Sequence, residues 1–258
     1  MTSESISPRS AIESARRTIA IERQAVEQLE QRIDDSFSKA VDLLASVEGR
    51  VIVSGMGKSG HIGNKIAATL ASTGTPAQFV HPAEACHGDM GMITRSDAAL
   101  LMSNSGTTGE ITALLPLLKR LGIPIVAITG NDTSTLATAA NVHLNISVSE
   151  EACPLDLAPT ASTTANLVMG DALAIALLEQ RGFTVEDFAF THPGGALGRR
   201  LLTRVSDVLV TGDDVPRVSP DTSLADALME ISAKGLGMST VIDENGDLLG
   251  IFTDGDLR

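Results

Sequence analysis

The sequence has 258 residues, which allows one large domain or a medium-sized domain followed by a small one. Its 43% of hydrophobic and 20% of charged residues are ordinary for a soluble globular protein. The net charge of −13 disfavours a surface for nucleic acid or anionic membrane, and without Trp or Tyr the chain offers few rings on which bases could stack. We therefore expect no nucleic acid and no membrane among its partners.

The sequence shows no targeting signal. Residues 1–10, MTSESISPRS, lack the apolar core of a signal peptide, and the longest apolar run, at 172–178, is far too short to span a bilayer. Cys86 and Cys153 form no recognisable disulfide framework, as expected in a reducing compartment. These features predict a soluble, cytoplasmic protein.

The first 48 residues follow a helical pattern. From residue 10 the apolar side chains recur at steps of three, four or seven, and Gly49 ends the run. We predict an N-terminal helical segment over 1–48, folded as one long helix or as two in line. It either covers a sheet or forms a subunit contact.

Residues 49–203 alternate short aliphatic runs with helical patterns. Strands are predicted at 51–54, 78–80, 98–103, 123–129 and 142–147, and helices at 62–71, 110–121, 134–140 and 163–181. Aliphatic strands that alternate with helices are typical of a parallel sheet covered on both faces. We predict an α/β domain of this kind over 49–203.

The pattern changes beyond Arg204. A strand-like start, a helix at 224–234, a strand at 240–243, a turn and a strand at 248–252 predict a small β-α-β-β unit over 204–258. The closing residues, FTDGDLR, are typical of the start of another helix. We therefore expect the chain to stop within this unit.

Two of the predicted strands end in turns rich in Gly and Ser: VIVSGMGKSG, residues 51–60, and LLMSNSGTTGE, residues 100–110. Such turns leave backbone N–H groups pointing outward, and the positive end of the next helix points the same way, which makes an anion site. One turn carries Lys58 and the other ends in Glu110. Together they predict a phosphorylated substrate held beside acid/base groups, as in a sugar-phosphate isomerase.

The first turn also has other interpretations. Gly55, Gly57 and Gly60 spell G-x-G-x-x-G, but a dinucleotide site wants an acid at the end of the next strand, and none follows before Glu84. A phosphate loop of the nucleotide-binding type would need glycine where Ile52 stands. We favour a tight turn that presents Lys58 to a substrate oxygen over a nucleotide-binding site. The third interpretation is that these glycines have a purely structural role.

The second turn carries four hydroxyls in six residues. Hydroxyls and N–H groups can surround a phosphate without arginine, whereas ordinary helix capping would need only one of them. Glu110 and the pair at 150–151 come at the carboxyl ends of strands, where parallel sheets place their sites. Either glutamate alone is typical of a solvated surface, but beside a phosphate site one of them becomes a candidate base for a sugar C–H proton.

Three histidines, His81, His87 and His192, lie in loops bounded by Pro or Gly. His81 and His87 with Cys86 could bind zinc, but no regular ligand spacing supports a structural site. We favour the interpretation that these histidines form hydrogen bonds to the substrate.

Five segments together closely resemble the bacterial arabinose-5-phosphate isomerases: SGMGKSGHIG, STGTPAQFVHPAEACHGDMGM, SNSGTTGEI, EACPLDLAPTASTTANLVMGDALA and HPGGALGRR. That family combines a sugar isomerase (SIS) domain with a tandem pair of CBS repeats, of which this chain holds most of one. The resemblance implies a five-stranded parallel sheet sandwiched by helices, followed by a partial CBS unit. It also implies a homotetramer that converts D-ribulose 5-phosphate to D-arabinose 5-phosphate, the first committed step toward the lipopolysaccharide sugar Kdo.

The resemblance also implies roles for individual residues. The catalytic groups are Lys58, Glu110, Glu151 and His192. The substrate contacts that it implies are Gly74, Thr75, His81, His87, the helix start after Glu110, and Ser147, Val148 and Ser149. The two turns themselves add Ser54, Ser103, Asn104, Ser105, Thr107 and Thr108 as expected substrate-binding residues. His81 matches a position associated with zinc that inhibits, and no cofactor is required. Because paired CBS repeats normally form the ligand cleft, regulation through residues 204–258 is left open.

The chemistry of aldose–ketose isomerisation gives these groups their tasks. A carboxylate moves a proton between C1 and C2 through an enediol while an electrophile steadies the enediolate oxygen. We assign the carboxylate to Glu151, with Glu110 as the alternative, and the electrophile to Lys58. His192, from its own chain or from a neighbouring subunit, would shuttle protons between the oxygens. Other hypotheses are a SIS-type regulator that senses sugar phosphate, or an isomerase of another sugar phosphate.

Overall fold

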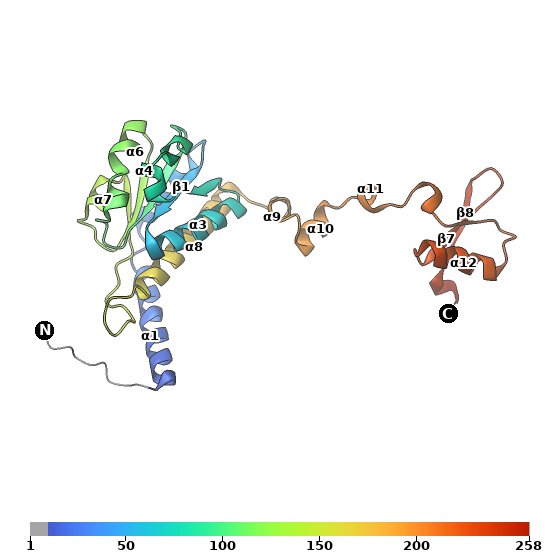
Figure 1. The fold of residues 1–258 in the computed structure, drawn as a ribbon, viewed down its shortest axis with the longest axis horizontal. Helices are drawn as coiled ribbons and strands as arrows, with labels where there is room; N and C mark the ends of the chain where they lie inside the picture. Colours follow the sequence, from blue (N-terminus) through green and yellow to red (C-terminus); the bar gives the residue numbers. More distant parts are fainter. Residues whose placement is uncertain (1–9, 258) are drawn as a thin grey trace. The chain divides into compact units, whose positions relative to one another are not determined.

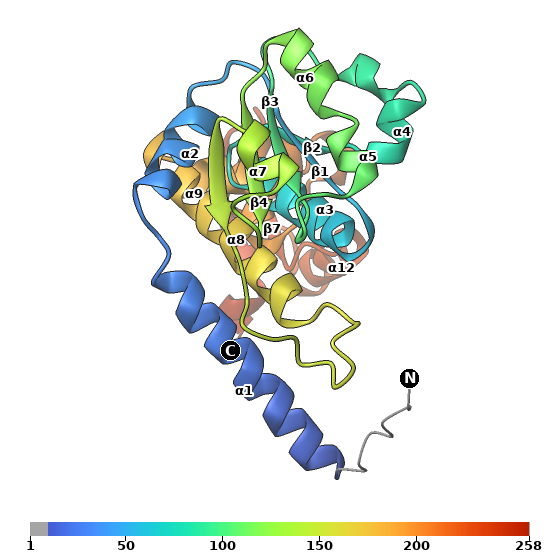
Figure 2. The same cartoon turned by 90° about the vertical axis from the view of Figure 1, so that its left-hand side faces the viewer.

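The computed structural model describes residues 10–257, which form two compact units that divide between Leu201 and Leu202 (Figure 1). A five-stranded parallel sheet forms the centre of the first unit (Figure 2). Its strands are β1 (Val51–Gly55), β2 (Ala77–Phe79), β3 (Ala98–Met102), β4 (Ile125–Thr129) and β5 (Val142–Asn145). They lie in the order β2-β1-β3-β4-β5, with Gly55 paired to Met102 and Met102 to Ile128. Because all strands run the same way, the residues that follow them emerge at one edge, called here the carboxyl edge. The predicted parallel sheet is confirmed.

Helices cover both faces of this sheet. One face carries α1 (Ala11–Glu30), α2 (Asp35–Ala45), α3 (Gly57–Ser72) and α8 (Ala161–Arg181). The other carries α4 (Pro82–Cys86), the 3₁₀ turn η1 (Asp89–Met92), α5 (Gly109–Thr112), α6 (Leu115–Leu121) and α7 (Thr135–Ala139). Alternate strand residues separate the two apolar layers, since Val53 and Leu100 face α3 and α8 while Ile52 and Leu101 face the opposite layer. This is the α/β sandwich that the sequence predicts.

The structure settles the bounds of several helices. The N-terminal run is two helices, because Asp34 has an extended backbone and caps α2 by accepting a hydrogen bond from the N–H two residues on, at 2.8 Å. The expected helix at 110–121 divides into α5 and α6, since Pro116 cannot donate the helical hydrogen bond. Helix α3 begins earlier than expected, at Gly57, which places Lys58 in its first turn.

Helix α8 lies against α3. The two approach closely at Gly170, where an added Cβ would lie 2.2 Å from Ile66 Cδ1, and Lys65 forms an ion pair with Asp171. Within residues 10–257, α8 is the one helix long and apolar enough to cross a membrane. Half of its apolar stretch is buried inside the first unit, as in the core helix of a folded domain.

Asp97 ties the turn before β3 to the start of β1. Its carboxylate is 2% exposed and accepts hydrogen bonds from Arg50 N and Thr94 N, each at 2.7 Å. Burial by itself would raise the pKa of this carboxyl, but the hydrogen bonds from Arg50 and Thr94 outweigh burial and lower the pKa. The ionised form therefore stabilises the folded state.

Replacing this residue, Asp97→Asn, is expected to lower the free energy of unfolding at neutral pH by roughly 1–3 kcal/mol. Because the folded pKa lies below the unfolded value, the contribution is complete above about pH 4 and is lost as the pH falls through the folded pKa. In urea denaturation, the difference in the free energy of unfolding between variant and wild type should therefore become smaller at acidic pH. Glu48→Gln, at an exposed position nearby, should leave stability unchanged. Equal stability of Asp97→Asn and wild type at neutral pH would contradict this account.

The second unit is built on a three-stranded sheet. Strands β6 (Arg217–Val218) and β7 (Met238–Ile242) are parallel, and β8 (Leu248–Thr253) runs antiparallel to β7. Helix α12 (Leu224–Lys234) is capped by Ser223 Oγ, which accepts a hydrogen bond from Asp226 N at 3.2 Å. This is the β-α-β-β arrangement that the sequence predicts. The remaining short helices and turns are α9 (Val185–Thr191), α10 (Ala196–Leu202), α11 (Val205–Val208), η2 (Gly212–Asp214) and η3 (Asp254–Leu257).

Candidate active site

The loop between β3 and α5, residues 103–108, gathers hydroxyl groups at the carboxyl edge and is called here the hydroxyl loop. The Oγ of Ser103 lies 2.8 Å from the Oγ1 of Thr108, within hydrogen-bonding distance, and Thr107 Oγ1 donates to Ser105 Oγ at 3.1 Å. Ser105 and Thr107 are not buried, so their remaining hydrogen-bonding capacity faces outward. An ordered loop of hydroxyls at the start of a helix is suited to an anion such as phosphate.

Neighbouring elements fix the hydroxyl loop in place. The Leu136 N–H of α7 donates to the Gly106 carbonyl at 3.0 Å, and Gly130 N donates to the Asn104 carbonyl at 2.8 Å. Gly106 has a φ of +66°, and a Cβ added there would lie 2.0 Å from Ser134 Oγ. Only glycine fits this position without moving the loop.

Gly106→Ala is therefore expected to raise KM for a sugar phosphate about tenfold or more, with a smaller effect on kcat, because strain of roughly 1–3 kcal/mol displaces the loop. Gly122→Ala is the matched control, since Gly122 has a φ of +76° but no atom within 4 Å of the added Cβ. Steady-state kinetics on both variants, with thermal unfolding alongside, separates loop displacement from general loss of stability. An unchanged KM in Gly106→Ala would show that the loop does not bind substrate.

Two buried polar atoms without partners lie on elements that neighbour β3 or α5. Ser54 is 1% exposed, pairs in register with Leu101 of β3, and its Oγ has no hydrogen-bond partner. The Nδ1 of His81, at the start of α4, is likewise buried and unpaired. Helix α4 packs against α5, whose first turn carries the exposed Glu110. Because a buried polar group is costly unless water or a ligand satisfies it, these atoms are candidates for contact with a polar ligand.

Lys58 approaches the same edge from α3. Helices α3 and α8 run in the same direction, since Lys65 pairs with Asp171 near their middles and Arg181, at the end of α8, donates to Thr75 Oγ1 at 3.1 Å just beyond the end of α3. The two helices therefore both begin at the carboxyl edge (Figure 2). Their positive dipole ends add to the field that favours an anion there.

Glu151 is held at the N-terminus of α8. Its Oε2 accepts hydrogen bonds from Thr160 N at 2.6 Å, Thr160 Oγ1 at 2.8 Å and Ser162 N at 3.3 Å. Burial by itself would raise the pKa of this carboxyl, but the hydrogen bonds from Ser162 and Thr160 outweigh burial and lower the pKa. Glu151 is thus an ionised, oriented carboxylate at the helix end that neighbours the first turn of α3.

The segment after β5 joins the hydroxyl loop. A Cβ added at Gly130 would lie 2.7 Å from Asn104 Oδ1 and 3.5 Å from Ser147 Cα, so the two segments meet there. Val148 and Ser149 continue from this point toward the start of α8. The structure therefore brings the hydroxyl loop, the start of α3 and the segment at 147–151 to one edge of the sheet.

Three other expected site residues lie at the opposite end of α3. Gly74 and Thr75 follow directly after that helix. His192 is held near them, because the neighbouring Thr191 Oγ1 donates to the Ser72 carbonyl at 3.1 Å. Its ring stacks on Phe188 with centroids 4.0 Å apart.

The length of α3 separates this group from Lys58. The helix has 16 residues, and at 1.5 Å per residue the step from Lys58 to Ser72 spans about 21 Å. Gly74, Thr75 and His192 of one chain are therefore not brought to the carboxyl edge of the same chain.

The residues around His81 do not fit a zinc site within one chain. His87 is exposed at the end of α4, beside the exposed Cys86. In residues 10–257, no group of three or more His, Cys, Asp or Glu side chains is placed to hold a metal ion. A zinc ion usually takes at least three protein ligands.

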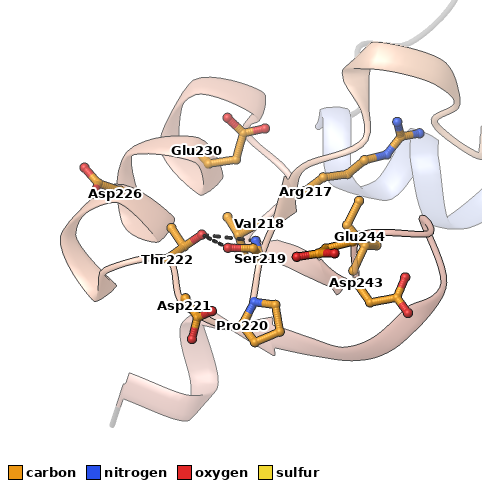
Figure 3. A pocket seen from close by; sticks show the side chains of 11 residues that line it. Arg217, Val218, Ser219, Pro220, Asp221, Thr222, Asp226, Glu230, Asp243 and Glu244 are labelled. Carbon is orange, nitrogen blue, oxygen red and sulfur yellow. Dashed lines mark hydrogen bonds between the residues drawn. The ribbon is translucent and has the colours of Figure 1, made fainter.

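The second unit has a cavity of about 740 Å³ (Figure 3). One guanidinium and five carboxylates line it: Arg217, Asp221, Asp226, Glu230, Asp243 and Glu244. At its floor, Ser219 N donates to Thr222 Oγ1 at 3.0 Å. The excess of negative charge disfavours a phosphorylated ligand, so this cavity is not the candidate site for a sugar phosphate.

Two family models match the chain. Residues 43–176 match the SIS domain and residues 205–258 match the CBS domain. With the parallel sheet and the hydroxyl loop, these matches define a SIS-type phosphosugar protein with a CBS unit.

Similar proteins of known name indicate which family within the SIS class the chain belongs to. The arabinose 5-phosphate isomerase KdsD of Pseudomonas aeruginosa is 66% identical over 247 residues, which are 96% of this chain and 76% of the relative. The protein of the same name from Escherichia coli K12 is 57% identical over 246 residues, 95% of this chain and 75% of the relative. A solved structure from E. coli CFT073, in complex with arabinose 5-phosphate, is 44% identical with a TM-score of 0.69 and covers 70% of this chain and 97% of that one. The chain belongs to the arabinose 5-phosphate isomerase family, as the sequence predicts.

Proposed function

We propose that the protein is an isomerase that interconverts D-ribulose 5-phosphate and D-arabinose 5-phosphate. The observation that carries this function is the meeting of the hydroxyl loop, the first turn of α3 with Lys58, and Glu151 at one edge of the sheet. The names of the curated relatives and the arabinose 5-phosphate bound by the E. coli CFT073 protein support the substrate. In this family the product leads to Kdo and lipopolysaccharide, and we place the enzyme in the cytoplasm, where sugar phosphates are made.

The phosphate ester binds in the hydroxyl loop. Ser105 and Thr107 offer hydroxyls, and the N–H groups at the start of α5 are not used within the helix. A net charge of −13 does not prevent this, because N–H groups and hydroxyls at contact distance outweigh distant, screened carboxylates. The sugar chain then extends toward Lys58 and Glu151.

The proton transfer follows from the placement of these two charges. Glu151 is ionised and takes the C–H proton from the carbon next to the carbonyl, leaving an enediolate, and returns it to the adjacent carbon. Lys58, whose side chain is exposed at the helix start, stabilises the negative oxygen of the enediolate. Glu110 is the alternative carboxylate.

His192 acts from a second copy of the chain in this proposal. Within one chain it lies at the far end of α3 with Gly74 and Thr75. Helix α9 next to it exposes 76% of Phe190 and 58% of Val185, the kind of apolar surface that a subunit contact covers. A homo-oligomer, for which we propose a tetramer, would bring this group to the carboxyl edge of a neighbour, where His192 moves protons between the sugar oxygens. Zinc at His81 would inhibit if a second copy of the chain completed its ligands, because residues 10–257 of one chain bring no three ligand side chains together. We propose no required cofactor.

Incubation with D-ribulose 5-phosphate in D₂O tests the function directly. NMR should show the aldose anomeric signal appear, with deuterium incorporated at C2, because the enediol exchanges its carbon-bound proton with solvent. Saturable binding of the sugar phosphate without turnover would instead indicate a regulator.

A further inference from the structure

Thr160 occupies the N-cap position of α8 but does not cap the helix with its own side chain. Its hydroxyl donates to Glu151 Oε2 at 2.8 Å and accepts a hydrogen bond from Ala152 N at 2.8 Å. Its N–H donates to the same carboxylate oxygen at 2.6 Å. Glu151 therefore takes the place of the usual cap, and Thr160 holds it with both backbone and side chain.

Thr160 N, Thr160 Oγ1 and Ser162 N all donate to Oε2 of this carboxylate, the last at 3.3 Å. The Ser162 hydroxyl also lies close enough to lower the pKa of the carboxyl, but it forms no hydrogen bond of normal geometry, so within residues 10–257 Oε1 has no such bond. A general base needs an oxygen whose lone pairs are unoccupied and held in a fixed direction. Threonine suits the supporting role, because its branched side chain has few rotamers and its hydroxyl both donates and accepts.

We infer that Thr160 is a positioning residue for the isomerisation, which binds Oε2 of Glu151 and leaves Oε1 as the atom that takes the sugar C–H proton. This inference rests on the proposed function. The competing account is that Glu151 and Thr160 only stabilise the start of α8. The two accounts differ in what they expect for kcat and for its dependence on pH.

Few charged or titratable groups surround Glu151. Glu150 precedes it in the chain, and the Cys153 thiol follows, with its pKa lowered by backbone N–H groups of the next turn. From α1, Arg17 donates to the Ala152 carbonyl, and the first turn of α3 carries Lys58. The first turn of α8 has no charged side chain. Variants at Thr160 leave all these groups in place. A change in the pH at which kcat falls on the acidic side of its pH profile, called here the acidic limb, therefore reports on Glu151.

Thr160→Val removes the hydroxyl and keeps the side-chain shape and the backbone N–H. With the purified full chain and D-ribulose 5-phosphate, we expect kcat to fall about tenfold while KM changes by less than about twofold. The acidic limb of kcat should move upward by about one pH unit, because the lost O–H donor had stabilised the ionised carboxylate. Thr160→Ser, which keeps the hydroxyl, should restore both. Thr163→Val is the matched control, since that hydroxyl donates only to the Thr160 carbonyl, at 2.7 Å, and it should behave as wild type.

Normal kcat and an unmoved acidic limb in Thr160→Val, with Glu151→Gln inactive, would overturn the inference and leave the proposed function standing. A wild-type protein that does not convert D-ribulose 5-phosphate would overturn both. Circular dichroism checks the fold of each variant. Should Thr160→Val not fold, Thr160→Ala is measured against the same expected values.

Discussion

Replacing Glu151 by glutamine is expected to lower kcat by a factor of about 10³, with KM changed by less than about threefold. Glutamine keeps the shape of the side chain and an oxygen that can accept the hydrogen bonds of the α8 N-terminus. It cannot accept a proton from carbon. The loss should therefore appear in turnover and not in binding or in thermal unfolding, which are the measurements that check it.

Two further variants make this prediction specific. Glu150→Gln changes the same chemical group one residue away, at an exposed position, and should retain wild-type turnover. Glu110→Gln is expected to lose roughly tenfold, by weakening contacts at the start of α5. If the losses in Glu110→Gln and Glu151→Gln were exchanged, Glu110 would be the base. Near-normal rates in both would remove the carboxylate mechanism.

The sheet and the hydroxyl loop could be predicted because local and global constraints agree there. Aliphatic runs such as residues 98–103 alternate with helical patterns, which leaves a parallel sheet as the arrangement that buries both faces. Parallel strands must end at one edge, so the turns after Gly55 and Met102 had to meet. The roles proposed for Lys58 and for the hydroxyls rest on that geometry.

The way in which Glu151 is held could not be predicted from the residues alone. Its partner Thr160 lies nine residues away, across an irregular segment in which Asp156 adopts a φ of +52°. No periodicity describes such a segment. The sequence places Glu151 after a strand, but the hydrogen bonds that orient it and lower its pKa depend on where α8 begins.

Sequence patterns also could not predict that the expected site divides into two groups, one at the carboxyl edge and one at the other end of α3. A turn such as the one containing Gly74 resembles the turn containing Gly57, since both are small and polar, yet α3 carries them to opposite edges of the sheet. The path of the chain after Arg181 sets the position of His192, and no repeating pattern describes that path. His192 therefore lies away from Lys58 of the same chain.

Mixing two inactive variants is expected to restore activity if the second copy supplies His192. His192→Asn and Glu151→Gln each lack one group of the site, but in a mixed oligomer one site of a pair takes both groups intact. For random association in pairs, half of the pairs are mixed and each has one complete site, so about a quarter of the wild-type rate should return. The physical reason is the distance of about 21 Å along α3 that separates the two groups within one chain.

The control for this experiment mixes two variants whose substitutions both lie at the carboxyl edge of the same chain. Glu151→Gln mixed with Lys58→Met should recover no activity, because every site in the mixed oligomer then lacks one of the two side chains. Co-expression with different affinity tags yields the mixed species for assay, and native mass spectrometry counts the copies. Absence of recovery in the first mixture, with mixed oligomers present, would show that His192 acts within its own chain after a rearrangement of α9 or has no part in the reaction.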